Sequence, residues 1–393
     1  MVAQEHRSSK LLKGLVLLFL CVPLSFQLFH WRNFTPLNGV QDSKAKELKD
    51  SLSGNLDWFS GSYQRHTEVY LGENLAVKNP LVRLRNQVEY SVFGKINAQQ
   101  IYAYKGNLFR FYSADYNEGT SFIGQEAVNE KVRKLSKIQA FLGESHPIIL
   151  AIAPSKTYFY AEDLPEVHTR KTDQSNYKAI KKEALKKGLH VIDFNTYFLD
   201  IKKSSMSPLI SKSGIHWSMY GAALAMDSLV GKVEKLKQSA YSHPTYTLDK
   251  TYRFFYNDND LAQLLNVLSP PNDSDLRCLT FPAQTPGGKK IRALIISDSF
   301  FDVVSMTDLR QQLFTPDTKY LYYFNTRKDP TNNNQGLAGM NLLEEMEKAD
   351  CIILLNDIVN MENFGFGFIE RAYSEIQKEK RSKRKGANFH SPL

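Results

Sequence analysis

The chain has 393 residues, of which 42% are hydrophobic, 12% aromatic and 23% charged, and its formal net charge is +9. This composition excludes a disordered protein, a collagen-like fibre and a disulfide-stapled miniprotein. Most of the charge lies at the two ends: residues 1–13 have a net charge of +2 and residues 378–385 one of +5, which leaves +2 for everything between. Because the body is nearly neutral, its charge does not indicate that it binds nucleic acid.

An apolar segment follows the basic N-terminus. No charged residue lies between Gly14 and Phe29, and His30 and Trp31 suit a membrane interface. Since no small-x-small cleavage motif follows, we predict an uncleaved transmembrane signal anchor over residues 14–31, with a buried core helix as the alternative. The positive-inside rule then makes residues 1–13 a cytoplasmic segment and places the rest of the chain outside the cytoplasm.

The segment after the anchor is polar and has few strand signals. Residues 32–85 therefore predict a stalk and an N-terminal helical subdomain, with a helix near 43–52. The pattern then changes: residues 86–93 favour a helix, and residues 101–112 favour a hairpin with a Lys-Gly-Asn turn between aromatic strands. Residues 125–142 place five apolar side chains on one helical face, which predicts an amphipathic helix.

Short apolar runs alternate with helical segments in the remaining chain. Three are typical of strands buried on both faces, and a weaker fourth follows a helical stretch; they span 147–153, 291–296, 351–355 and 190–194. This alternation predicts an α/β domain over residues 86–377, with a mainly parallel sheet covered by helices on both faces. Chemistry in such sheets gathers at the carboxyl ends of the strands. Residues 378–393 form a basic tail, which we expect to be solvated.

The sequence predicts neither a metal site nor a cofactor. Its three cysteines are Cys21, Cys278 and Cys351, and no CxxC motif or Cys/His pair has the spacing of a zinc site.

A serine follows the apolar run 291–296, at the point where a strand leads into a helix. Residues 297–302 are Ser-Asp-Ser-Phe-Phe-Asp, with Ser299 where helical N–H groups can stabilise an oxyanion formed beside it. This position suits a nucleophile. The alternative is that Asp298 or Ser299 simply caps the helix.

The motif Ser-Gly-Ile-His-Trp-Ser at 213–218 precedes a helical run. The positive end of the helix dipole disfavours an imidazolium, so His216 is expected to be neutral and able to act as a base. Trp217 would wall the site or stack on a sugar face, and Ser218 would cap the helix. The alternative role of this motif is packing and capping alone.

Two further strand ends carry polar side chains. Lys156 and Tyr158 follow the run 147–153, where Lys156 would hold an anionic or carbonyl group or form a surface ion pair, and Tyr158 would contact substrate. Asn356 and Asn360 follow the run 351–355, where a side-chain amide can donate to an oxyanion or form an ordinary turn.

Together these motifs resemble the SGNH-hydrolase-like domain of the alginate O-acetyltransferase family, the AlgX and AlgJ type of bacterial cell envelopes. The resemblance rests on the order of APSKTYFYAEDLP, VIDF, GIHWSMYGAALAMD, ALIISDSF and CIILLNDIVN, and covers roughly residues 86–375. It implies that Ser299 is the nucleophile and His216 the base. It also implies a polysaccharide substrate and an inner-membrane protein that delivers the acyl group, with the main domain of a single-pass protein in the periplasm.

The chain departs from the family at one position. Where the family motif has its acid, two residues before the histidine, this chain has Gly214, which cannot orient an imidazole. A Ser-His dyad, an acid from elsewhere and lost activity all remain open. Four aspartates near strand ends are candidate acids: Asp193, Asp298, Asp302 and Asp357.

Two functions follow from these residues. The first is an enzyme that adds acyl groups to an envelope polysaccharide or removes them, as an O-acyltransferase or a carbohydrate esterase with a serine nucleophile. The second is an inactive SGNH-like protein that binds glycan or assists its assembly.

Overall fold

The computed structural model of the chain describes most residues from 59 onward and a few before them. The described residues are 13–14, 17, 21–22, 25–26, 29, 34–39, 59–94, 100–110, 121–164, 174–249, 258–271, 273–283, 287–328 and 334–388.

The chain divides into two compact units. The first consists of Met1–Ile101 and Ala262–Pro271, and the second of Tyr102–Leu261 and Asn272–Leu393. The first unit contains the helices α3 (Ser62–Asn74) and α4 (Lys78–Phe93). Helix α4 crosses residue 86, where we expected the α/β domain to begin.

Most of the expected anchor, residues 14–31, and the helix expected near 43–52 lie outside the described residues. Among the residues that are described, no helix combines the length and the apolar character that crossing a bilayer requires. The anchor therefore stays a prediction.

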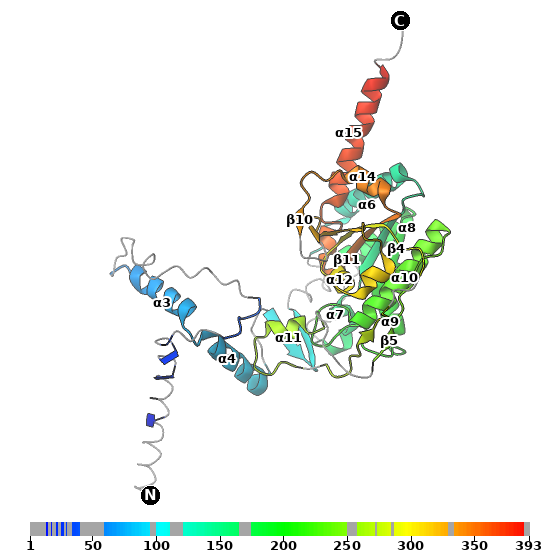
Figure 1. The fold of residues 1–393 in the computed structure, drawn as a ribbon. Helices are drawn as coiled ribbons and strands as arrows, with labels where there is room; N and C mark the ends of the chain where they lie inside the picture. The colour runs from blue at the N-terminus through cyan, green and yellow to red at the C-terminus, as the bar shows by residue number, and fades with distance from the viewer. Residues whose placement is uncertain are drawn as a thin grey trace. The chain divides into compact units, whose positions relative to one another are not determined.

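The second unit is built on a sheet of seven strands, shown with its helices in Figure 1. The strands, in their order across the sheet, are β10 (Gln335–Gly336), β9 (Thr326–Lys328), β8 (Lys319–Tyr322), β7 (Ala293–Ser297), β11 (Cys351–Asp357), β3 (Ile148–Ala153) and β4 (His190–Asp193). The five from β8 to β4 are parallel, whereas β9 and β10 pair antiparallel at one edge. The four strands expected from the apolar runs are confirmed, and the mainly parallel sheet with them.

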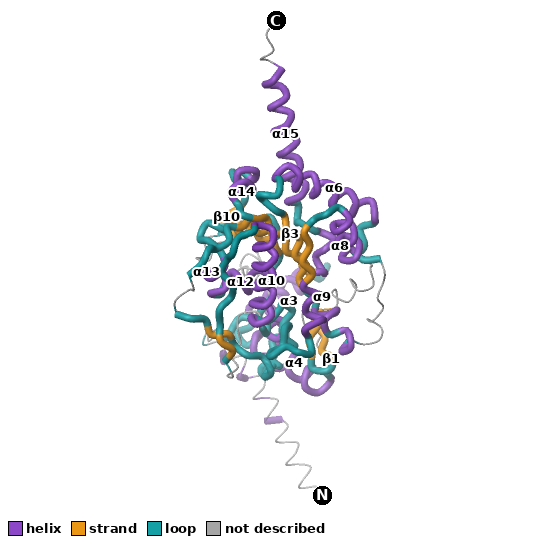
Figure 2. The backbone as a smooth tube through the Cα atoms, turned by 90° about the vertical axis from the view of Figure 1, so that its right-hand side faces the viewer, coloured by secondary structure: helices purple, strands orange, loops and turns teal. Residues whose placement is uncertain are grey.

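Helices cover both faces of this sheet, and Figure 2 shows the orange strands enclosed by purple helices. Side chains of one face pack against helices α9 (Phe194–Ile201), α10 (Met219–Lys237), α12 (Phe300–Ser305) and α13 (Asp308–Leu313). Those of the other pack against α6 (Gln125–Leu142), α8 (Asn176–Lys186), α14 (Leu342–Lys348) and α15 (Phe368–Asn388).

The alternation along each strand explains the two cores. In β3, for example, Ile149 and Ala151 belong to the first core and Ile148 and Leu150 to the second, because successive side chains point to opposite faces. All five apolar residues of the predicted helix 125–142 are buried, as expected for α6.

Several short elements remain, and two of them, β1 and α11, include residues of both units. They are the hairpin β1 (Ile101–Tyr104) and β2 (Asn107–Arg110), the pair β5 (Thr247–Leu248) and β6 (Leu279–Thr280), the short helices α7 (Lys156–Phe159) and α11 (Asp260–Leu264), and the 3-10 turns η2 (Ala161–Asp163) and η4 (Ile358–Asn363). The hairpin confirms the prediction for 101–112 as far as residue 110.

The basic C-terminal segment differs from the expectation. Helix α15 does not end at residue 377 but continues through the basic run to Asn388. Lys, Arg, Glu and Gln are strong helix formers and no proline interrupts them, so the helix propagates beyond its buried first turns. Residues 389–393 lie outside the described part of the chain.

Candidate active site

Ser299 lies in the turn between β7 and α12, at the carboxyl edge of the sheet. Its side chain makes no capping hydrogen bond to the helix. The neighbouring Asp298 does so instead, because its Oδ1 accepts the backbone N–H of Phe300 at 3.1 Å. The hydroxyl of Ser299 is therefore available for another partner.

His216 lies in the loop that precedes α10. The next residue, Trp217, is fully buried, and its indole Nε1–H donates to the carbonyl of Phe300 at 3.0 Å. The indole thus joins the histidine loop to the first residue of α12. Trp217 packs in the core and does not wall the site or offer a face to a sugar, so our expectation for it was wrong.

The start of α10 fixes the other side of this loop. Ser218 caps the helix as predicted, since its Oγ accepts the N–H of Gly221 at 3.0 Å. Gly221 is needed here because a Cβ at this position would lie 2.3 Å from the carbonyl oxygen of Leu209. The close approach of α10 to the chain before the histidine therefore depends on a glycine.

The two predicted residues meet and a third joins them. His216 Nε2 lies 2.7 Å from Ser299 Oγ, and His216 Nδ1 lies 2.6 Å from Asp260 Oδ2. A carboxylate on Nδ1 favours the tautomer with the proton on that nitrogen, which leaves Nε2 to accept the hydroxyl proton of the serine. This is the geometry of a Ser-His-Asp triad.

Asp260 is itself held in place by the backbone. Its Oδ1 accepts the N–H of Ile215 at 2.9 Å and the N–H of Leu261 at 2.7 Å. The first of these bonds ties the carboxylate to the residue just before the histidine, so the acid and the base share one fixed arrangement.

The surroundings of His216 adjust its basicity in opposite directions. Burial lowers the pKa of the imidazole, but the charge and hydrogen bond of Asp260, with smaller contributions from Asp298 and Asp302, outweigh it and leave the pKa raised above 6.5. The imidazolium formed when the histidine takes a proton is thus stabilised.

The acid was not among the four aspartates that we had considered. Asp193 caps α9 and accepts from Tyr177 and Lys181, and Asp302 pairs with Lys328 at 2.6 Å. Asp298 and Asp357 lie beside Ser299 in the sheet but neither bonds the imidazole. We had considered these four because they lie near strand ends. Asp260 instead begins a short helix that does not follow a strand of the main sheet. Its one sequence signal is an aspartate at the start of the run Asp-Leu-Ala-Gln-Leu.

Asp298 organises the turn that carries Ser299. Its Oδ2 accepts the backbone N–H of Asp357 at 2.8 Å and the amide of Asn360 at 3.0 Å. Burial raises the pKa of Asp298 even though these bonds and the one from Phe300 oppose the shift. Asp298 therefore connects the end of β7 to the end of β11.

Lys156 is buried and bonds the histidine loop. Its Nζ donates to the carbonyl of Gly214 at 2.6 Å and to that of Lys212 at 2.7 Å. Burial lowers the pKa of this amine to about 7, against the opposing charges of Asp260 and Asp273. We expected Lys156 to hold an anionic or carbonyl group of a substrate or to form a surface ion pair; in the structure it is buried and bonds two carbonyls of its own chain.

Three predicted site residues remain: Asn356, Asn360 and Tyr158. Asn356 is fully buried at the end of β11, and neither atom of its amide has a hydrogen-bond partner among the described residues. Asn360 instead gives its amide to Asp298. Tyr158 packs edge-on against Tyr177, with ring centroids 5.9 Å apart, and is away from the triad contacts. Of the two side-chain amides, that of Asn356 is the one without a hydrogen-bond partner among the described residues.

No set of three or more His, Cys, Asp or Glu side chains within the described ranges is arranged to hold a metal ion.

Comparison with known proteins adds a match to a family model. Residues 110–279 match the family model of the SGNH hydrolase-like domain, acetyltransferase AlgX, which confirms the resemblance seen in the sequence motifs. The matched segment contains His216 and Asp260 and ends before Ser299. A search of curated proteins found no match.

Three solved structures are similar to this chain. The O-acetyltransferase domain of Pseudomonas putida AlgJ is 16% identical, with 70% of this chain and 99% of that chain covered and a TM-score of 0.45. Bacillus cereus PatB1 is 14% identical, with 68% and 98% covered and a TM-score of 0.41. Pseudomonas aeruginosa AlgX is 12% identical, with 73% and 70% covered and a TM-score of 0.40.

Proposed function

We propose that this protein is a serine-dependent enzyme that transfers acyl groups, most simply acetyl, to or from hydroxyls of a cell-envelope polysaccharide. The observation that carries the proposal is the continuous hydrogen-bonded chain from Ser299 through His216 to Asp260. The match to the AlgX acetyltransferase domain supports acetyl as the group and polysaccharide as the substrate class.

The first half of the reaction acylates the serine. His216 Nε2 takes the proton of Ser299 Oγ as that oxygen attacks the acyl carbonyl carbon, and a tetrahedral oxyanion forms. The intermediate collapses when the bond to the donor's oxygen breaks, and the imidazolium returns its proton to that oxygen. Asp260 stabilises the imidazolium throughout and keeps its ring oriented.

The second half releases the acyl group. A sugar hydroxyl, or water in an esterase, gives its proton to His216 and attacks the acyl-serine; the second intermediate then expels Ser299 Oγ, which is reprotonated. Backbone N–H groups of the β7–α12 turn would stabilise both oxyanions. The amide of Asn356 is the side chain that we propose assists them, because it lies in β11 and has no hydrogen-bond partner among the described residues.

A membrane location fits the same proposal. The apolar segment 14–31 supports a single N-terminal span in the bacterial inner membrane, with the α/β domain in the periplasm. Acetyl-CoA is not available there, so an inner-membrane protein would deliver the acyl group. The inactive glycan-binding alternative rested on Gly214, and the carboxylate of Asp260 at His216 removes that reason for it.

The test is hydrolysis of p-nitrophenyl acetate by the purified protein and by Ser299→Ala. We expect the variant to be slower by roughly a thousandfold or more, because removal of one triad member leaves only binding and oxyanion stabilisation. Ser136→Ala on α6 is a matched control, since that hydroxyl has no hydrogen-bond partner among the described residues. Equal rates for the wild type and Ser299→Ala would contradict the proposal.

A further inference from the structure

The peptide group between Asp298 and Ser299 is held by a side chain that the proposed mechanism does not use. The hydroxyl of Tyr320, on β8, donates to the backbone carbonyl of Asp298 at 2.8 Å. Tyr320 is 1% exposed, and its ring packs edge-on against that of Phe301 in α12, with centroids 4.9 Å apart. One buried side chain thus contacts both the residue before Ser299 and the helix after it.

This contact also sets the direction of the N–H of Ser299. The carbonyl of Asp298 accepts a second bond, from Ser297 Oγ at 3.0 Å, so both of its lone pairs are used. Because the C=O and N–H of a trans peptide point in opposite directions, a fixed carbonyl fixes the N–H of the next residue. The N–H of a nucleophilic serine can serve as a donor to the oxyanion that forms beside its own Oγ.

A second acceptor competes for the proton of Tyr320. Asp302 Oδ1 lies 3.1 Å from the hydroxyl oxygen, against 2.8 Å for the carbonyl of Asp298. A hydroxyl has one proton, and a carboxylate without a counter-charge would be the stronger acceptor. Lys328 Nζ, from β9, supplies that counter-charge, because it contacts both carboxylate oxygens of Asp302 at 2.7 and 2.6 Å. The ion pair therefore leaves the phenol proton to the carbonyl.

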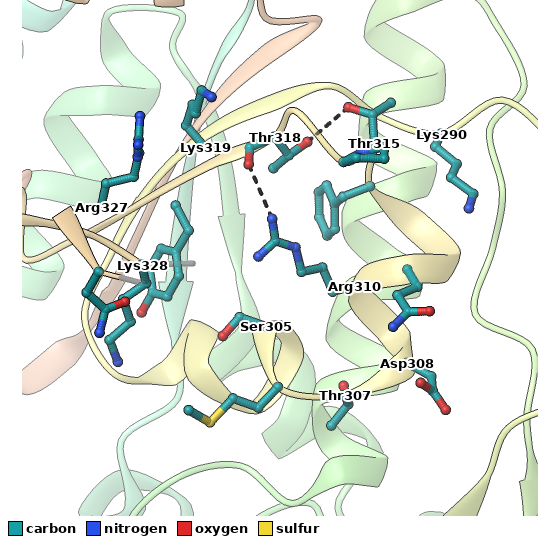
Figure 3. Close-up of a pocket in the computed structure, with 16 residues that line it drawn as sticks. Lys290, Ser305, Thr307, Asp308, Arg310, Thr315, Thr318, Lys319, Arg327 and Lys328 are labelled. Carbon is teal, nitrogen blue, oxygen red and sulfur yellow. Dashed lines mark hydrogen bonds between the residues drawn. The ribbon is translucent and has the colours of Figure 1, made fainter. Parts of the chain in front are cut away.

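The cluster borders a cavity but remains mostly buried. Tyr320 and Lys328 both line this space of about 1150 Å³, and Figure 3 shows Lys328 and Ser305, the last residue of α12, at its border. The side chain of Lys328 is 21% exposed and that of Asp302 10%. Burial and the charges of Asp302 and Asp298 raise the pKa of Tyr320 well above its ordinary value, so the phenol keeps its proton and remains a donor.

We propose that Tyr320 is a positioning residue for the reaction at Ser299: its hydroxyl holds the peptide between Asp298 and Ser299 so that the N–H of Ser299 is aimed at the oxyanion. Lys328 acts one step further away, by keeping Asp302 from taking the phenol proton. The inference rests on the proposed function, in which an oxyanion forms beside Ser299. It gives a role to strands β8 and β9, which contribute no residue to the triad.

Tyr320→Phe removes only the hydroxyl and tests the proposal in p-nitrophenyl acetate hydrolysis. Loss of a whole oxyanion donor lowers kcat by roughly 10²- to 10³-fold, so a donor that is kept but less well aimed should cost about 10- to 50-fold. Both half-reactions pass through an oxyanion and should slow together, so KM should stay within about twofold. Rates are expressed per serine labelled to completion by phenylmethanesulfonyl fluoride, which excludes unfolded molecules.

Tyr177→Phe is the matched control. It removes the hydroxyl of another buried tyrosine, which donates to Asp193 Oδ2 at 2.6 Å, and it should leave kcat within about twofold. Equal kcat values in the wild type and Tyr320→Phe, or equal losses in Tyr320→Phe and Tyr177→Phe, would overturn the proposal.

A pair of substitutions at Lys328 tests the same bond without altering the tyrosine. Lys328→Gln leaves the carboxylate of Asp302 without its counter-charge, so the phenol proton should turn to it and kcat should fall by about fivefold. Lys328→Arg keeps the ion pair and should retain kcat within about twofold. If Tyr320→Phe does not fold, this pair decides the matter, and equal rates for Lys328→Gln and Lys328→Arg would overturn the proposal.

Hydrogen exchange measures the positioning without catalysis. In the peptic peptide that contains residues 298–304, we expect amides to exchange about tenfold faster in Tyr320→Phe than in the wild type, because the turn has lost a buried hydrogen bond. An unchanged exchange rate would contradict the role given to Tyr320. A wild-type protein that neither hydrolyses the ester nor is labelled would contradict the proposed function instead, and the exchange rate would still show whether Tyr320 holds the turn.

Discussion

The turn that carries Ser299 and the loop that carries His216 are held in place in different ways. The serine turn is fixed largely from within the sheet: Asp298, the adjacent residue, bonds the start of α12 and the end of β11. The histidine loop is fixed by side chains from segments distant in the chain, Lys156 on its carbonyls and Asp260 on the N–H of Ile215.

This difference separates two physical problems. A strand-to-helix turn next to buried strands has its geometry set by secondary structure, which places the partly buried Ser299 at the carboxyl edge of the sheet. A loop with little regular structure needs its backbone groups satisfied by other means, because buried N–H and C=O groups without partners are costly. One of the two side chains that satisfy them, Asp260, also bonds the imidazole of His216.

The largest expected effect concerns Asp260, the carboxylate that bonds the histidine loop. Asp260→Asn should lower kcat by roughly 10³- to 10⁴-fold in p-nitrophenyl acetate hydrolysis, because an amide favours the wrong tautomer of His216 and cannot stabilise its charged form. Asp193→Asn is the matched control, since Asp193 caps α9 and does not contact the imidazole. If both variants lost the same activity per folded molecule, Asp260 would not be the triad acid.

A smaller effect is expected from the serine turn. Asp298→Asn keeps the shape of the side chain but replaces one acceptor oxygen by an NH2 group. The backbone N–H of Asp357 and the amide of Asn360 then compete for the remaining oxygen or stay without an acceptor. The free energy of unfolding should fall by about 3 kcal/mol, the cost of unsatisfied buried donors. Urea denaturation measures it, and a change below about 0.5 kcal/mol, typical of surface substitutions, would contradict the role given to Asp298.

Lys156, which bonds two carbonyls of the histidine loop, should make the free energy of unfolding depend on pH. With a pKa of about 7 in the folded protein and an ordinary value of 10.5, Lys156 binds its proton in the unfolded chain but not in the folded one between these pH values. Its contribution to stability therefore rises with pH through that window.

Lys156→Met removes this contribution and leaves two carbonyls without their donor, so at pH 9 the free energy of unfolding should fall by about 2 kcal/mol. Urea denaturation at pH 7 and at pH 9 gives the slope for both proteins. Identical slopes would show that Lys156 keeps an ordinary pKa.

The smallest effect is the position of the acidic limb in the pH profile. His216 must be neutral to accept the serine proton, and its pKa is raised by Asp260 and other carboxylates against the effect of burial. The value of kcat/KM should thus fall as the pH drops through a midpoint above 6.5, and in Asp260→Asn the midpoint should move lower. A wild-type midpoint at or below 6.5 would contradict the stabilising effect of the carboxylate.

The difference between the serine turn and the histidine loop also explains which features the sequence could predict. Apolar runs and a helical periodicity were sufficient for β3, β4, β7, β11 and α6, and the strand-end rule placed Ser299 correctly. Strand β8 was missed because Lys319–Tyr322 mixes polar and apolar residues. The contact between Ser299 and His216 was expected from the family resemblance, and the two lie 2.7 Å apart.

Asp260 could not be found in this way. It acts from a short helix whose position depends on tertiary packing, and spacing along the chain carries no record of that. The resemblance led us to expect an acid at the position of Gly214, but it did not indicate which other segment would supply a carboxylate.

The central claim is that Ser299 is a nucleophile activated by His216, and covalent labelling tests it most directly. The protein is incubated with phenylmethanesulfonyl fluoride, and its intact mass and peptide map are determined beside those of Ser299→Ala and His216→Ala. We expect one sulfonyl group per wild-type molecule, located on Ser299, and no label on either variant. No labelling of the wild type, or equal labelling of Ser299→Ala, would contradict the account.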